Sequence, residues 1–159
     1  MQRIEKTNAI RLVEQKNIKF TVHTYLDSDA ISGVEVAKYL HEDPNVCFKT
    51  LVTVGKSKNH YVFLIPVHKE LDLKKAAKAV NEKNIEMVKS KELLGLTGYI
   101  HGGCSPIGMK KFFKTTIDES VILQDKIIFS GGKIGYQIET TLEELEKVIS
   151  FSLIDIVKD

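Results

Sequence analysis

Residues 99–108 combine the backbone freedom and the stiffness that a ligand-binding loop requires. Gly102 and Gly103 carry no Cβ, so their backbone N–H groups can approach a ligand closely. Pro106 fixes one φ angle and stiffens a segment that the glycines would otherwise leave loose. Amides held in a stiff loop can bind a carbonyl or carboxylate oxygen, but the same composition is typical of a tight surface turn. The loop alone is compatible with both interpretations.

Lys49 interrupts an otherwise apolar run over residues 46–54 that predicts a buried strand. A lysine in such a strand must reach water with its tip, pair with an anion or lose its proton. If the side chain lines a pocket, its ammonium group can polarise an ester carbonyl or hold a phosphate. A lysine on the solvent face of an edge strand is the alternative, and this residue alone favours neither.

The sequence predicts neither a metal site nor a cofactor. The H-x-x-C spacing of His101 and Cys104 is not a strong zinc signature, and His41 with Cys47 does not supply a matched second pair. Ser105 lacks the G-x-S-x-G elbow of a serine nucleophile, and the proline after it removes an amide that could donate to an oxyanion. We therefore expect a site with neither a metal ion nor an obvious protein nucleophile.

The composition is that of an ordinary globular protein. The chain has 159 residues, 43% of them hydrophobic and 28% charged, which predicts one domain over residues 1–159. The longest apolar run, residues 61–67, is far short of a bilayer span, and no stretch of signal-peptide type follows the first residues. Cys47 and Cys104 do not form a disulfide framework and fit a reducing compartment. We therefore expect a cytoplasmic protein without a membrane partner.

The formal net charge of +2 does not by itself indicate a nucleic-acid partner. Lys110, Lys111 and Lys114 nevertheless cluster directly after the glycine loop. A basic rim beside one loop suits a polyanionic substrate bound with modest affinity. Taken alone, the cluster is better explained as the solvated face of a helix.

The periodicity of apolar residues predicts an α+β domain of short strands with helices between them. Capping boxes at residues 32–35 and 141–144 mark the starts of two helices. The apolar runs 46–54 and 60–67, joined by five residues, predict a central hairpin. The other expected helices cover residues 6–16, 72–80 and a short segment from residue 90, and the other expected strands cover 18–25, 85–88, 121–123, 126–130, 135–139 and 151–157.

Three separated motifs resemble the YbaK/EbsC family, which belongs to the superfamily of the bacterial prolyl-tRNA synthetase editing domain. They are Lys49-Thr50-Leu51, the segment 102–111, and Ser130-Gly131-Gly132-Lys133. The similarity extends over nearly the whole chain, and it is closer to the free-standing family members than to the domain embedded in the synthetase. The resemblance implies a mixed, barrel-like β-sheet with peripheral helices.

The resemblance also implies an activity, that of a free-standing aminoacyl-tRNA deacylase. Such an enzyme cleaves the ester of mischarged tRNA, typically cysteine on proline tRNA, and cysteine on its own tRNA is the second substrate that the resemblance leaves open. The family's key lysine falls on Lys49, which is the expected catalytic residue. The expected substrate-binding residues are Tyr25, Ile31, Thr50, Gly102, Gly103, Cys104, Ser105, Pro106, Gly108, Ser130 and Gln137. The expected tRNA contacts are Lys110, Lys111, Lys114 and Lys133.

Two positions depart from the family's usual pattern. Gln137 stands where a pocket aspartate is usual, and Ile31 stands where phenylalanine is common. We expect the amino-acid preference to be more sensitive to these changes than the activity itself. An alanyl ester on proline tRNA therefore stays an alternative substrate.

The attacking group and the partners are less closely defined. Without a protein nucleophile, the attacker is either water or the thiol of a cysteinyl substrate, and attack by the thiol would be a cyclising cleavage, formally a lyase reaction. A non-catalytic regulatory protein, as the EbsC name suggests, is the alternative of a different class, and an intact Lys49 with the 102–106 loop argues against it. Mischarged tRNA is the expected partner, prolyl-tRNA synthetase stays open as a second one, and no DNA partner is expected.

Overall fold

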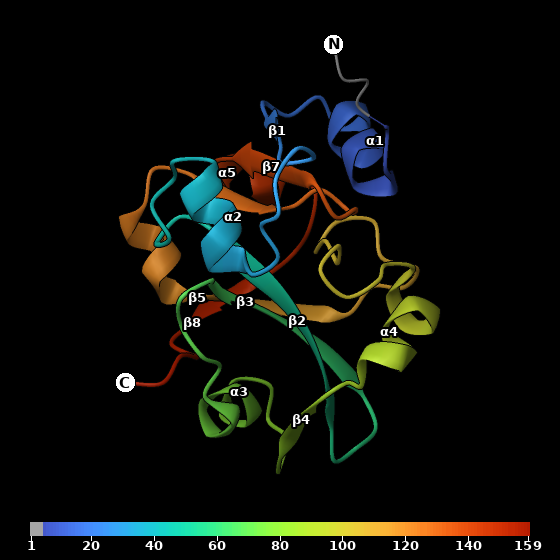
Figure 1. Cartoon of the computed structure of the whole chain (residues 1–159). Helices are drawn as coiled ribbons and strands as arrows, with labels where there is room; N and C mark the ends of the chain where they lie inside the picture. Colours follow the sequence, from blue (N-terminus) through green and yellow to red (C-terminus); the bar gives the residue numbers. More distant parts are fainter. Residues whose placement is uncertain (1–4) are drawn as a thin grey trace.

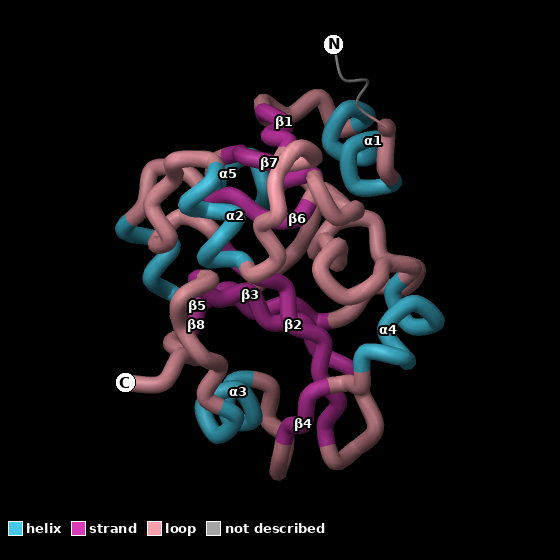
Figure 2. The backbone as a smooth tube through the Cα atoms, viewed as in Figure 1, coloured by secondary structure: helices cyan, strands magenta, loops and turns pink. Residues whose placement is uncertain are grey.

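Residues 5–159, the part of the chain that the computed structural model describes, form five α-helices, one 3₁₀-helix and eight strands (Figures 1 and 2). The strands lie in two sheets with the helices around them. The α+β class predicted from the sequence is therefore confirmed. Within residues 5–159, no helix is both long enough and apolar enough to cross a membrane.

The larger sheet has five strands in the order β4-β2-β3-β5-β8. Its centre is the predicted hairpin, in which β2 and β3 pair antiparallel, while β3, β5 and β8 run parallel to one another. Both strands of the hairpin are largely buried, which explains their continuous apolar runs. The bounds are β2 Phe48–Gly55, β3 His60–Pro66, β4 Ile85–Met87, β5 Lys114–Asp118 and β8 Ser152–Ile154.

The smaller sheet is antiparallel, with β7 (Tyr136–Thr140) between β1 (Thr21–Thr24) and β6 (Ile127–Ser130). A single parallel bridge between Cys47 and Ile128 joins it to the start of β2. One main hydrophobic core is shared by both sheets, since it includes Phe48 and Val52 of the larger sheet with Phe129 and Ile138 of the smaller. This joined arrangement agrees with the barrel-like fold implied by the resemblance.

Short helices with well-formed caps surround the sheets. Ser32 and Glu35 form the predicted capping box, in which each side chain accepts a hydrogen bond from the other residue's backbone N–H. Asp72 and Thr141 cap two further helices through their side-chain oxygens, and the capping box predicted at residues 141–144 is present as the Thr141 cap. The bounds are α1 Asn8–Gln15, α2 Gly33–Tyr39, α3 Leu73–Ala79, α4 Ser90–Thr97 and α5 Leu142–Glu146.

One predicted strand is wrong. Residues 121–123 belong to the 3₁₀-helix Glu119–Leu123, not to a strand. The carboxylate of Asp118 accepts a hydrogen bond from the backbone N–H of Ser120, 3.2 Å away, and turns the chain at the end of β5. A side-chain cap of this kind competes with strand pairing, and the local apolar pattern does not reveal it.

Candidate active site

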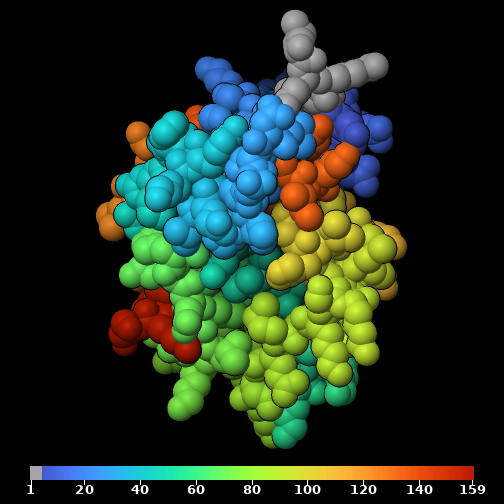
Figure 3. All heavy atoms as spheres, in the orientation of Figure 1, coloured from blue at the N-terminus to red at the C-terminus, as the bar shows by residue number. Residues whose placement is uncertain are grey.

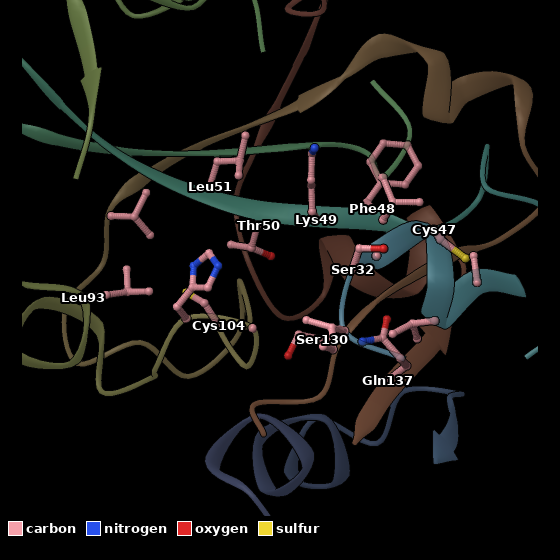
Figure 4. A pocket seen from close by; sticks show the side chains of 18 of the residues that line it. Ser32, Cys47, Phe48, Lys49, Thr50, Leu51, Leu93, Cys104, Ser130 and Gln137 are labelled. Atoms are coloured by element: carbon pink, nitrogen blue, oxygen red, sulfur yellow. The ribbon is translucent and has the colours of Figure 1, made fainter. Parts of the chain in front are cut away.

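A cavity of about 450 Å³ opens along one edge of β2, which is within the usual size range of small-molecule sites. It lies between α2, the start of α4 and the 99–108 loop, with Ser130 and Gln137 of the smaller sheet closing it from below in Figure 4. Eight of the residues predicted for the site line it. They are Tyr25, Ile31, Lys49, Thr50, Gly102, Cys104, Ser130 and Gln137.

The edge of β2 is unpaired where it passes the cavity. On this edge, β4 pairs with Thr53–Gly55, and β6 pairs with the chain just before β2, through a single bridge at Cys47. The register with β3 directs the backbone groups of odd-numbered β2 residues toward β3, so those of Thr50 face the opposite, open edge. The cavity therefore lies against a short stretch of open β-sheet edge.

Thr50 also brings a buried hydroxyl to the cavity. Its Oγ1 has no hydrogen-bond partner among residues 5–159. A buried hydroxyl without a partner costs about 1–3 kcal/mol, a cost that a bound polar ligand would relieve. Thr50 thus combines a side-chain hydroxyl with a backbone N–H and C=O at one position of the cavity wall.

Lys49 and Thr50 leave opposite faces of β2 (Figure 4). The Thr50 side chain points toward the Cys104 and Ser130 side, and Lys49 points away from it. Neighbouring residues of a strand must alternate in this way. Because the cavity extends around the open edge of the strand, both residues line it.

The Lys49 side chain is half-buried in the cavity wall. Burial lowers the pKa of its ammonium group, and the nearby carboxylate of Glu70 opposes part of that effect. Glu70 also forms an ion pair with Lys158, at 2.9 Å. Its carboxylate is therefore shared between the two lysines and neutralises the charge of Lys49 only in part. The charge of Lys49 therefore lies in a partly dehydrated setting, where it interacts strongly with a carbonyl or a phosphate oxygen.

The 99–108 loop opens with a tight turn. The backbone N–H of Gly103 donates to the carbonyl of Ile100 at 3.0 Å, and Gly102 has φ of +86°, as the third residue of a type II turn requires. The Gly103 amide is consequently already used and is not the free donor that the loop composition predicted. A Cβ at Gly103 would lie 3.1–3.2 Å from the backbone of Lys133 and Ile134, so this glycine permits close packing of two loops.

Four predicted site residues, Gly103, Ser105, Pro106 and Gly108, lie outside the lining of the cavity. Ser105 is fully buried, and its hydroxyl accepts a hydrogen bond from the N–H of Ile107. The Tyr99 hydroxyl donates to the carbonyl of Ile107 at 2.6 Å, and Gly108 (φ +81°) packs against that same hydroxyl. These contacts hold the loop in shape behind the residues that face the cavity.

The remaining predicted residues contribute different parts of the wall. Tyr25 is buried, whereas the Ile31 side chain is 88% exposed and lies at the rim. The hydroxyl of Ser130 accepts a hydrogen bond from the N–H of Gly132 at 3.2 Å. Gln137 lies beside Ser130 in the register of β7 with β6, which places both at the same level of the cavity.

The four lysines predicted to contact tRNA differ in whether they form ion pairs within the protein. Lys133 forms an ion pair with Glu5 at 2.6 Å. Lys110, Lys111 and Lys114 are exposed, and no ion pair in the described part of the chain includes them. Figure 3 shows the segment around residues 100–110 (yellow) on the same face as the light-blue segment before α2, with the teal surface of β2 between them.

Sequence patterns alone missed several lining residues. One wall is made by Ser32, Gly33, Val36, Ala37 and Leu40 of α2 and its cap. A helical pattern of apolar residues indicates that one face of α2 is buried, but it does not tell which surface that face covers. Also missed were Val67, Met87, Val88, Ser90, Leu93 and His101, as well as Cys47, Phe48, Leu51 and Val52 of β2 and its start.

A polar cluster with three possible metal ligands lies outside the cavity lining, near Cys47. The ligand atoms of His23, Glu42 and Glu139 lie within 4.8 Å of one another. The ammonium group of Lys126 is 2.7 Å from Glu42 and 3.5 Å from Glu139, so this cluster already contains a cation. We assign it a structural role between the loop after α2 and the smaller sheet.

Both cysteine thiols in the cavity wall should react slowly with alkylating reagents. Burial raises the pKa of Cys104 to about 11 and that of Cys47 to about 12. Since the thiolate is the reactive form, both groups stay almost wholly protonated, and thus unreactive, at pH 8. Mass spectrometry after iodoacetamide treatment should find both largely unmodified in the native protein and modified after denaturation. Rapid native labelling of Cys104 would contradict this assignment and indicate an activated thiol.

Comparison with known proteins assigns the chain to a family. The family model described as "Aminoacyl-tRNA editing domain" matches residues 18–148. A protein of Enterococcus faecalis named "Putative Cys-tRNA(Pro)/Cys-tRNA(Cys) deacylase EbsC" is 46% identical over 142 residues, which are 89% of this chain and 87% of that protein.

Two solved structures share the fold. One, titled "Crystal structure of a putative trans-editing enzyme for prolyl tRNA synthetase", has a TM-score of 0.83 at 22% identity, over 98% of this chain and all of that one. The other, a protein titled only as hypothetical, has a TM-score of 0.86 at 18% identity, over 96% of this chain and all of that one. Together with the family model and the 46% identical relative, they confirm the resemblance found in the sequence. The chain therefore belongs to the aminoacyl-tRNA editing domain family.

Proposed function

We propose that this protein is a free-standing aminoacyl-tRNA deacylase whose main substrate is cysteine esterified to proline tRNA. The observation that carries the proposal is the juxtaposition of Lys49, the open edge of β2 at Thr50, and the 99–108 loop around one cavity. The name of the 46% identical relative from Enterococcus faecalis supports the same activity and substrate.

The ester would lie across the open edge of β2. The Lys49 ammonium group, which lines the cavity from one face of the strand, would bind the ester's carbonyl oxygen, while Thr50 offers hydrogen bonds to the α-amino or ester groups. Charge that develops on the carbonyl oxygen is stabilised by a cation held in a partly dehydrated wall. Aminoacyl esters are already activated, so positioning and this stabilisation supply a large part of the catalysis.

A second cleavage site is physically necessary for proline tRNA. A synthetase pocket shaped for proline cannot strongly reject a smaller side chain, because a missing methylene is worth only about 1–3 kcal/mol. A separate enzyme that cleaves the wrong ester restores accuracy. The exposed lysines 110, 111 and 114 supply the positive charge that binding of the tRNA phosphates requires.

A panel of charged tRNAs tests this proposal. Purified protein is mixed with cysteinyl-, alanyl- and prolyl-esters of the same proline tRNA, and the remaining ester is followed with time. Rapid loss of the cysteinyl ester with an intact prolyl ester is the expected result. Preferential loss of the alanyl ester would instead assign the alternative substrate, and binding without cleavage of any ester would indicate a regulatory protein.

Substitution of Gln137 by aspartate should raise turnover on several aminoacyl-tRNAs together. A carboxylate attracts the substrate's α-ammonium group with a charge-assisted hydrogen bond, whereas the present amide offers only neutral ones. No Asp or Glu lines the cavity among the described residues, so the added charge would be the first there. We expect about a tenfold increase for Gln137→Asp, or about 1.4 kcal/mol, measured as kcat/KM. Unchanged or reduced rates for every ester would contradict this role of position 137.

A further inference from the structure

His101 occupies the corner of the turn that opens the glycine loop. The turn is closed by the Gly103 to Ile100 hydrogen bond, and Gly102 takes its left-handed position, so His101 is the second residue of a type II turn. Its side chain is exposed and lines the cavity. The turn thus fixes the backbone of His101 through Gly102 and Gly103, and it places the imidazole at the cavity.

The cavity has few groups that can accept a proton. Among the described residues, no carboxylate lines it, and its ionisable side chains are Tyr25, Cys47, Lys49, His101 and Cys104. Burial raises the pKa of both thiols, which keeps them protonated in neutral solution. The phenol of Tyr25 is ordinarily a proton donor, and Lys49 serves the carbonyl in its charged form. This leaves the imidazole, the side chain that ordinarily exchanges protons between pH 5 and 8.

We propose that His101 is the general base of the reaction, taking the proton from the cysteinyl thiol of the substrate; the proposal rests on the deacylase function. A ring nitrogen accepts the S–H proton as the sulfur attacks the ester carbonyl carbon. A carbon–sulfur bond forms, and the bond from that carbon to the ribose oxygen breaks. The imidazolium then returns the proton to the leaving ribose oxygen, so the products are a cyclic thioester and uncharged tRNA.

The proposed base addresses the main chemical obstacle to this attack. A thiol with an ordinary pKa of about 8.5 is only a few per cent thiolate at neutral pH. A positioned base removes the proton as the bond forms, a contribution of typically 10²–10⁴-fold in enzymes. Above the pKa of the substrate thiol, the thiolate forms without help and the base becomes dispensable. This dependence on pH separates thiol attack from water attack, for which a base stays necessary.

The test compares His101→Ala and His101→Gln with the unchanged protein in single-turnover cleavage of the cysteinyl ester of proline tRNA. Glutamine keeps polarity at the turn but cannot accept a proton. Both variants should be about 10²-fold slower at neutral pH. Added imidazole should restore a large part of the lost rate to His101→Ala. The defect should shrink as the pH rises above about 8.5.

The control is His68→Ala, which removes an exposed histidine outside the cavity lining. It should leave the rate unchanged.

Each outcome has a definite meaning. Variants as fast as the unchanged protein would overturn the role of His101 and leave the deacylase function standing. A rate defect that added imidazole does not relieve and that persists at every pH would also overturn the role of His101 as a base. Such a defect would indicate that His101 has a structural role in the turn. If the unchanged protein cleaves no ester, the deacylase function fails and this proposal fails with it.

Discussion

Lys49→Ala should lower kcat/KM for the cysteinyl ester of proline tRNA by about 10²–10³-fold, the usual cost of losing one group that stabilises an oxyanion. The reason is the position of Lys49 in the cavity wall, half-buried and with its charge partly dehydrated. Lys49→Met is a sharper variant because it keeps most of the apolar stem and removes only the ammonium group. Both rates should be measured alongside far-UV circular dichroism and thermal unfolding.

The matched control is Lys56→Ala, which removes an exposed lysine at the end of the same hairpin. It should leave both the rate and the melting temperature unchanged, since the side chain of an exposed lysine contributes little to stability. Near-normal activity of a folded Lys49→Met protein would contradict the catalytic role of Lys49. Loss of folding in both Lys49 variants would instead show that the residue is needed for the structure.

The second large effect is expected for Gly103→Val. A Cβ here would lie 3.1–3.2 Å from the backbone of Lys133 and Ile134, and a backbone cannot rotate away as a side chain can. Valine adds two further methyl groups, so overpacking should cost about 1–3 kcal/mol of unfolding free energy. The displaced 130–135 segment includes Ser130 of the cavity wall, so activity should fall as well.

Gly95→Val is the control for the Gly103 substitution. Gly95 lies on an exposed part of α4, and nothing lies within 4 Å of the position that its Cβ would take. Chemical denaturation should therefore give Gly95→Val a free energy of unfolding close to that of the original protein. Equal stability of the two variants would contradict the close packing of the two loops.

Much of the fold could be predicted from local chemistry. The hairpin 46–67 was predictable because its two apolar runs flank a polar five-residue turn, and the capping box at Ser32 fixed the start of α2. The 3₁₀-helix at residues 119–123 could not be predicted, because it depends on the side chain of Asp118 capping the chain. Apolar periodicity contains no information about such a contact.

Some residues of the site could likewise be predicted from the sequence, and others could not. Lys49 stood out because a charge in an apolar strand needs an explanation, and it does line the cavity. Gly103 was misinterpreted as a bare amide, since composition does not show that its N–H closes a turn with Ile100. The open edge at Thr50 and the α2 wall are products of tertiary arrangement, so no local pattern could reveal them. His101 was visible in the sequence, but only the turn and the absence of cavity carboxylates in the described chain give it a role.

The rate of ester loss from cysteinyl-tRNA(Pro), compared directly with alanyl-tRNA(Pro), tests the central claim most directly. Both esters should be made on the same tRNA and followed in parallel with the unchanged protein, with Lys49→Met, and in buffer alone. We expect the unchanged protein to cleave the cysteinyl ester faster than the alanyl ester, and Lys49→Met to approach the buffer rate. A cysteinyl ester that survives with the unchanged protein as long as it does in buffer would contradict the claim that this cavity is a deacylase site.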